Sequence, residues 1–155
     1  MRSSTNGMRI GVCLSLVFLL SGCFSFTMYE SPTTGPTASM EFPYVGNPIG
    51  GGGIRRISIG EAEGCTNRRW HPWRDTAKLA EGKPLYIIQG YYYGAYGGGC
   101  YAAYTFTPKA GEKYISEFDY GDRRCRIRLL RVSSSGAKIV VPEAKPIDVP
   151  NCWGT

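Results

Sequence analysis

The chain has 155 residues, with 18 basic and 12 acidic side chains and a formal net charge of +6. This length suits one folded domain with a short extension, and a second full domain is not expected. The charge excess is mild, so composition argues against a nucleic-acid-binding protein and favours contact with anionic surfaces.

The first residues have the pattern of an export signal. Arg2 and Arg9 supply positive charge ahead of Ile10–Leu20, an apolar run of 11 residues. A membrane-spanning helix needs roughly 20 apolar residues, so this run is too short to cross a bilayer. Its length is that of the apolar region of a signal peptide, roughly 7–15 residues.

The apolar run ends in Leu20-Ser21-Gly22-Cys23, which resembles the lipobox of bacterial lipoproteins. In that family the cysteine thiol takes a diacylglyceryl group, and a signal peptidase then cuts before it. The resemblance implies lipid, such as palmitate, on Cys23 and a membrane-anchored protein of the cell envelope. Because Phe24 rather than Asp follows, it also implies the outer membrane, facing the periplasm, in a host with two membranes. The alternatives are an ordinary secretory signal with a coincidental cysteine, or a short buried helix.

Loss of the signal, residues 1–22, leaves 133 residues with a net charge of about +4, since two arginines go with it. Residues 23–53 are rich in turn formers, including Ser31–Thr37 and a run of four glycines. No helical or strand period persists, so we predict a flexible tether over 23–53. The alternative is that Met40–Phe42 and Tyr44–Val45 add an edge strand to the domain.

Strand signals dominate residues 54–155. Thr76–Glu81 suggests one helical turn or a loop. Alternation over Cys100–Thr107 and again over Glu112–Tyr120 places apolar side chains on one face of each run, and it resumes at Arg124. Short strands with regular turns predict an all-β domain, a small disulfide-stapled sandwich or partial barrel.

The corner between two of these strands carries a motif, Phe106-Thr107-Pro108-x-x-Gly111-x-x-Tyr114, flanked by Cys100 and Cys125. It resembles a pattern in small, uncharacterised bacterial lipoproteins and envelope proteins of β-sandwich type. Its logic is similar to that of a tyrosine corner, in which a tyrosine hydroxyl holds the corner backbone. The resemblance implies a fold and no activity.

Four cysteines remain besides Cys23 and the signal's own, namely Cys65, Cys100, Cys125 and Cys152. An even number in an exported domain predicts two disulfides, for which three pairings exist. We favour Cys100–Cys125, because both occupy inward-facing strand positions, with Cys65–Cys152 as the second bridge. No Cys-x-x-Cys spacing occurs, so a metal site is not expected.

Catalytic motifs are missing from the sequence. His71 is the only histidine, so it cannot form a multi-histidine metal site. Neither Gly-x-Ser-x-Gly nor a phosphate-binding Gly-x-x-x-x-Gly-Lys occurs. We therefore predict that the protein is not an enzyme and uses neither metal nor cofactor.

A basic row is the first candidate binding surface. Arg124, Arg126 and Arg128 alternate along one strand, so they share a face. Such a row suits an anionic envelope polysaccharide or another envelope protein. The competing interpretation is a solvated face that discourages pairing between sheet edges. We predict a structural or interaction role in the envelope.

A tyrosine- and glycine-rich loop, residues 90–101, is the second candidate. Exposed tyrosines such as Tyr92 and Tyr96 bind partners with little loss of entropy. The alternative function is therefore a periplasmic inhibitor or binding module that inserts this loop into a partner's cleft. The competing interpretation places about half of the tyrosines in the core.

Overall fold

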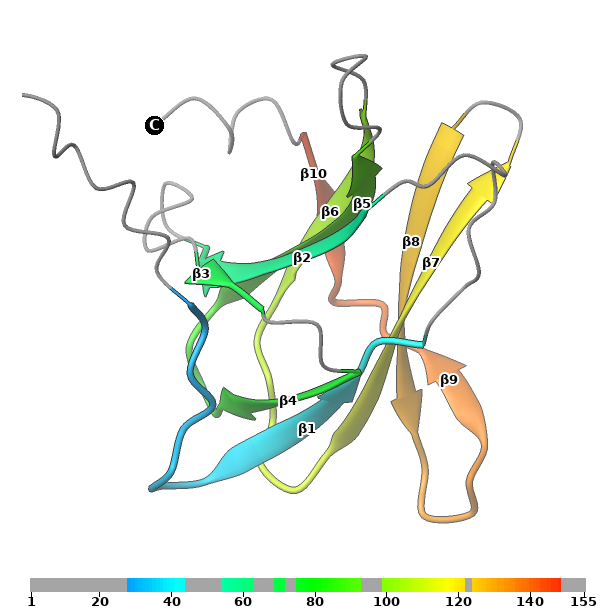
Figure 1. Cartoon of the computed structure of the whole chain (residues 1–155). Helices are drawn as coiled ribbons and strands as arrows, with labels where there is room; N and C mark the ends of the chain where they lie inside the picture. Colours follow the sequence, from blue (N-terminus) through cyan, green and yellow to red (C-terminus); the bar gives the residue numbers. More distant parts are fainter. Residues whose placement is uncertain are drawn as a thin grey trace, which may run out of the picture.

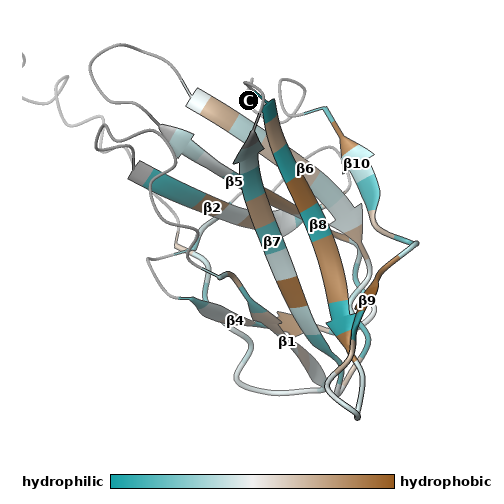
Figure 2. Cartoon of the chain, turned by 90° about the vertical axis from the view of Figure 1, so that its right-hand side faces the viewer, coloured by the Kyte–Doolittle hydropathy of each residue, from teal (hydrophilic) through white to brown (hydrophobic). Residues whose placement is uncertain are grey.

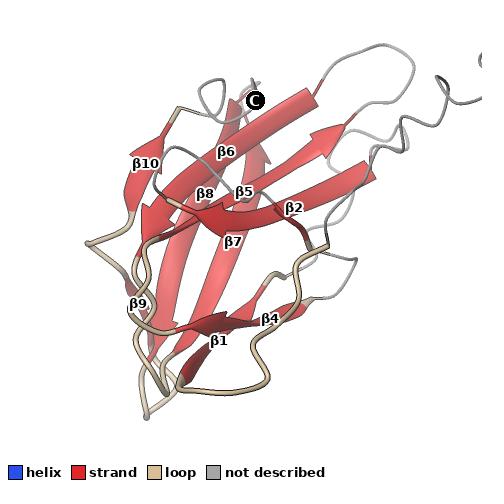
Figure 3. Cartoon of the chain, turned by 90° about the vertical axis from the view of Figure 1, so that its left-hand side faces the viewer, coloured by secondary structure: helices blue, strands red, loops and turns tan. Residues whose placement is uncertain are grey.

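The computed structural model describes residues 28–43, 54–62, 69–71, 75–92, 99–121 and 124–148. Every regular element in these ranges is a β-strand (Figure 3). The strands form two five-stranded sheets that do not close into a barrel (Figure 1). The predicted all-β sandwich is confirmed.

The first sheet, sheet I, is antiparallel throughout. Its strands are, in spatial order, β10 (Lys145–Ile147), β6 (Gly99–Phe106), β5 (Leu85–Tyr92), β2 (Ile54–Glu61) and β3 (Arg69–Trp70). The central strand, β5, pairs with β2 and β6 over its whole length. β5 is therefore an interior strand of the sheet, and its mostly apolar sequence is typical of a buried strand.

The second sheet, sheet II, contains one parallel pair. Its strands are, in spatial order, β4 (Thr76–Ala80), β1 (Thr37–Glu41), β7 (Lys113–Gly121), β8 (Arg124–Val132) and β9 (Lys138–Val140). β1 runs parallel to β7, with Ser39 opposite Lys113, and all other neighbours are antiparallel. β7 and β8 form a long hairpin that stands along one side of the molecule (Figure 1).

β1 corrects the predicted tether. It falls within residues 23–53, yet it lies between β4 and β7 inside sheet II. Ala38 and Met40 alternate with more exposed residues and are buried in the core, at 2% and 0% exposure. Residues 28–43 therefore belong to the sandwich, and the strand considered as an alternative at Met40–Phe42 is internal rather than an edge. β4 likewise replaces the helical turn or loop suggested for Thr76–Glu81.

The main core lies between the sheets and uses alternate residues of both. Its buried members include Ile57, Ile59, Leu85, Ile87, Tyr104 and Phe106 from sheet I, and Ala38, Met40, Ala77, Leu79, Tyr114 and Leu129 from sheet II. The inward positions on β6 and β7 are those that the sequence alternation predicts. Burial of these side chains is the main source of stability.

A buried polar cluster crosses this core. The Gln89 side-chain amide donates to the Ser116 hydroxyl at 2.6 Å and to the Ser116 carbonyl at 3.0 Å. The Tyr104 hydroxyl donates to the same serine hydroxyl at 2.7 Å. Each group is satisfied, so the cluster joins the two sheets without leaving an unpaired buried polar atom here. Burial raises the pKa of Tyr104, which keeps its hydroxyl protonated.

Two predicted links are present between the sheets, a hydrogen bond at the β6–β7 corner and a disulfide. The Lys109 backbone N–H donates to the Tyr114 hydroxyl at 3.3 Å, which is the hydrogen bond expected of a tyrosine corner. Gly111 has a φ of 74°, a conformation that glycine adopts without strain. A disulfide joins Cys100 on β6 to Cys125 on β8, with Cα atoms 5.8 Å apart. This bridge confirms the favoured pairing and connects one sheet to the other.

Candidate functional site

The predicted arginine row lies on the outer face of sheet II. Arg124, Arg126 and Arg128 are all exposed, while the two residues between them, Cys125 and Ile127, are partly buried. Figure 2 shows the same alternation as teal and brown bands along β7 and β8. The hairpin register explains it, because each residue on β8 is fixed opposite one on β7.

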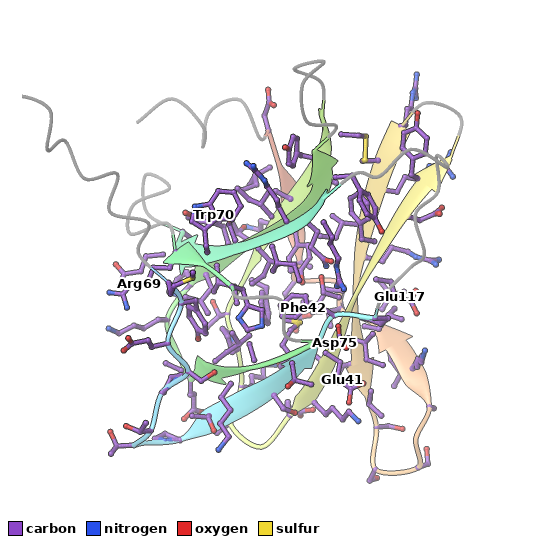
Figure 4. The ribbon with its side chains drawn as sticks, in the orientation of Figure 1. Glu41, Phe42, Arg69, Trp70, Asp75 and Glu117 are labelled. Atoms are coloured by element: carbon purple, nitrogen blue, oxygen red, sulfur yellow. A yellow bond between two sulfur atoms is a disulfide. The ribbon has the colours of Figure 1, made fainter. Side chains whose placement is uncertain are left out.

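Carboxylates on β7 face part of this row. Arg126 lies opposite Asp119, and Arg128 lies opposite Glu117. The Arg128 guanidinium contacts the Glu117 carboxylate at 3.1 Å, and the Lys138 ammonium from β9 contacts the same carboxylate at 3.5 Å. Glu117 is labelled beside the hairpin in Figure 4. The Glu117 carboxylate therefore forms ion pairs with two cations, Arg128 and Lys138.

The end of the row near the hairpin turn has a different environment. Arg124 lies opposite Gly121, which carries no side chain to neutralise it. Arg124 therefore carries a charge that its cross-strand neighbour on β7 does not balance. The cross-strand partner of each arginine is a feature that the residue spacing alone does not reveal.

The tyrosines divide between the interior and the predicted loop. Tyr86, Tyr91 and Tyr104 are buried at 0%, 3% and 2% exposure. Residues 90–92 and 99–101 of the predicted loop 90–101 belong instead to the paired strands β5 and β6. The side chain of Tyr92 and all of Tyr96 lie outside the described residues, so the insertion of a loop into a partner stays a prediction. The cysteines Cys23, Cys65 and Cys152 also lie outside them, as does the signal segment.

His71 packs among aromatic rings at the side of the sandwich where β3 and β4 are the edge strands. It is buried, and its ring centroid lies 5.4 Å from that of Phe42 and 6.0 Å from that of Tyr29. Tyr29 links the sheets here, because its N–H donates to the Trp70 carbonyl and its hydroxyl to the Lys78 carbonyl, each at 2.6 Å. Burial raises the pKa of Tyr29 to about 12, partly offset by the charge of Arg69. Phe42 and Trp70 are labelled in Figure 4.

A cleft lies on the side of the sandwich where the chain crosses from β9 to β10. Its volume is about 710 Å³. Its floor includes Phe106 and Tyr114, and its wall includes Ile139 and Val141. The charged residues that line it are Lys109, Arg131, Glu143 and Lys145.

Sequence reasoning did not find this cleft, because its lining comes from segments far apart in the chain. From Thr105 onward the lining residues lie on β6, β7, β8, β9 and β10 and on the connections β6–β7 and β9–β10, while Ala62 and Pro84 come from earlier loops. The one local signal is the short apolar run Ile139–Val141, which lies between Lys138 and Glu143. That signal is typical of any short edge strand.

The part of the chain that the structure describes has neither a metal-binding cluster nor a membrane-spanning helix. It contains no group of three or more histidine, cysteine, aspartate or glutamate side chains placed to hold a metal ion. It also contains no helix of the length and hydropathy needed to cross a membrane.

The fold and these surfaces define a two-sheet β-sandwich with a charged outer face on one sheet and a cleft at its side. Comparisons with protein-family models, curated proteins and solved structures found no match to this chain. Its function must therefore be argued from its own residues.

Proposed function

We propose that the protein is a lipid-anchored envelope protein whose arginine row on β8 binds an anionic envelope polymer. The observation that supports this most directly is the exposure of Arg124, Arg126 and Arg128 on one face of one strand. Residues two apart on a strand repeat about every 6–7 Å. Such a row suits the regularly spaced charges of a polymer better than a single small ion.

The charge balance of the face supports an anionic partner. Glu117 is shared by Arg128 and Lys138, so its one negative charge leaves a positive remainder. Arg124 lies opposite a glycine. Arginine also suits phosphate and carboxylate groups, because its planar guanidinium offers two parallel donors to them. Each exposed pair contributes only about 0–1 kcal/mol, so the three arginines must act together.

The test is the triple change of Arg124, Arg126 and Arg128 to Gln. Binding to a phosphate-bearing envelope polysaccharide, measured by biolayer interferometry, should fall at least tenfold and lose most of its salt dependence, because screening acts on charge pairs. A matched control changes Arg69, Lys78 and Lys83 to Gln, which removes the same charge from exposed positions elsewhere. The control should bind nearly as well as the parent, with melting temperatures unchanged.

Two results would contradict the proposal. Equal loss in both triple variants would show that only net charge matters. Unchanged binding in the arginine variant, with loss of a captured protein partner in Tyr92→Ala and Tyr96→Ala, would favour insertion of the loop instead.

The anchor is tested separately at Cys23. We expect Cys23→Ala to abolish incorporation of a fatty-acid analogue and to release the protein from membranes, since the lipid supplies most of its membrane affinity. Labelling of the exported chain, followed by membrane flotation, measures both. Persistent labelling of the variant would refute the lipobox assignment, and the arginine experiment does not depend on this result.

A further inference from the structure

The cleft beside β9 exposes apolar side chains that no described part of the chain covers. Ile139 and Val140 are 46% and 62% exposed, and both line the cleft. They are two of the three large hydrophobic residues that stand exposed among the described residues. Leaving such surface in water is unfavourable by roughly 25 cal/mol per Å², so an apolar ligand that covers it gains binding energy.

The floor of the cleft is aromatic and rigid. Phe106 and Tyr114 are almost fully buried, and their rings meet edge to face with centroids 5.2 Å apart. The tyrosine-corner hydrogen bond from Lys109 holds Tyr114 in place. A preformed floor of this kind lowers the entropic cost of binding. The volume of about 710 Å³ falls within the roughly 300–1,000 Å³ of small-molecule sites.

Cations outnumber carboxylates at the charged side of the cleft. Lys109, Arg131 and Lys145 line it, against Glu143 alone. Glu143 lies 3.6 Å from the Lys109 ammonium. Its own backbone N–H and then the charge of Lys109, with a smaller effect of Arg131, lower its pKa. The charged side of the cleft thus already stabilises one carboxylate, that of Glu143.

Lys145 is the cation left for a ligand. It is exposed, lines the cleft and makes no ion pair with any residue that the structure describes. Arg131 forms only a long ion pair, because its guanidinium lies 3.9 Å from the Glu112 carboxylate. An anionic head group placed between Lys145 and Arg131 would leave its apolar body against Ile139 and Val140.

We propose that this cleft binds, one molecule at a time, an organic anion with an apolar body, of the class of alkyl carboxylates and alkyl phosphates. The exposed apolar wall selects the body and the excess of cations selects the head. None of the three arginines of the β8 row lines the cleft. The site therefore stands independently of the proposed polymer binding.

An anionic head group with an alkyl chain occurs both in a free amphiphile monomer and in a lipid bilayer. We expect the cleft to bind the free monomer, because its apolar wall must be covered by the alkyl chain. The probes are dodecanoate and dodecyl phosphate below their micelle concentrations. Isothermal titration calorimetry with the full-length chain in detergent-free buffer should give saturable binding of one molecule. Dodecyltrimethylammonium, with the same chain and the opposite charge, should bind at least tenfold more weakly.

Variants locate the site. Lys145→Gln should weaken dodecanoate binding about three- to fivefold, the range expected for an exposed ion pair, while the matched Lys78→Gln should leave it unchanged. The double variant Ile139→Gln and Val140→Gln should weaken it at least tenfold, and because both positions are exposed the melting temperature should hold. In a ¹⁵N–¹H spectrum, dodecanoate should shift the amide signals of residues 139–145.

Several outcomes would overturn the inference. These are equal binding of the cationic probe, equal effects of Lys145→Gln and Lys78→Gln, and amide shifts confined to other parts of the chain. Binding to vesicles of anionic phosphatidylglycerol without binding of the monomer would also overturn it, and would assign the cations to a lipid surface.

Discussion

The outer faces of the two sheets differ sharply. On sheet I the outward residues Tyr86, Ile88 and Ala103 are buried at 0%, 2% and 3% exposure and form a second apolar cluster. On sheet II most of the outward positions near the hairpin are charged, and ion pairs join neighbouring strands, such as Lys113 with Glu41 at 2.7 Å. One sheet is therefore buried on both faces at its centre, whereas the outer face of the other carries exposed charges beside one buried apolar pair, Ile115 and Leu130.

Glycines explain how sheet I accommodates its outer cluster. Tyr86 lies directly opposite Gly60, and Tyr101 lies directly opposite Gly90. A Cβ added at either glycine would collide with the tyrosine ring across from it. Each ring therefore lies over the backbone of its neighbour, and each glycine leaves the space that the ring occupies. Glycine at these two positions therefore makes room for the packing of a tyrosine ring.

The largest effect is expected at Tyr86. Tyr86→Ala should lower the free energy of unfolding by about 3–5 kcal/mol, because it removes a fully buried ring and leaves a cavity over Gly60. Urea denaturation followed by fluorescence measures the change. On sheet II the matched outer-face change Arg124→Ala should stay within about 0.5 kcal/mol. Similar losses in the two variants would remove the distinction between the faces.

A smaller loss is expected at Gly90. Gly90→Ala should cost about 1–3 kcal/mol, since the new methyl group meets the ring of Tyr101 and the Cys100 carbonyl oxygen. Adding Tyr101→Ala should recover part of this loss, because one of the two obstacles is then gone. A Gly90→Ala variant as stable as the parent would show that the ring moves aside freely.

The smallest effect is expected for the ion pair on sheet II. A double-mutant cycle with Arg128→Ala and Glu117→Ala should give a coupling energy of about 0.2–1 kcal/mol, because both groups face water. This coupling should shrink between 0.05 and 0.5 M salt, roughly as the screening length shortens. A coupling above about 2 kcal/mol would mean that this face is stabilised as strongly as sheet I.

The sequence predicts the orientation of side chains best where a strand has one face in the core and the other in water. Arg124, Arg126 and Arg128 interleave with apolar residues, so the faces of β8 follow directly, and so does the inward position of Cys125. The corner motif likewise predicts the hydrogen bond to Tyr114, because all of its parts are local. Pairing of neighbouring hairpin strands needs no distant information.

Other features depend on distant partners and could not be predicted. β1 has only Ala38 and Met40 to mark it, among turn formers, and its partner β7 is encoded much later in the chain. The Gln89–Ser116 hydrogen bonds join two sheets whose packing no local pattern specifies. The apolar run of β5 indicates burial on both faces, but it does not show which side chains lie over Gly60 and Gly90. The cleft has the same cause, since its lining comes from separated segments.

The parallel pairing of β1 with β7 also sets an order of assembly. The β5–β6 and β7–β8 hairpins join segments close in the chain, so their loops close at low entropic cost. β1 pairs with β4 on one edge and with β7 on the other, so both of its edges are satisfied only when β7 is present. Such long-range pairing slows folding. We therefore expect a nascent chain to hold its first strand with one edge unpaired until β7 has been synthesised, and sheet II to complete only after the hairpins exist.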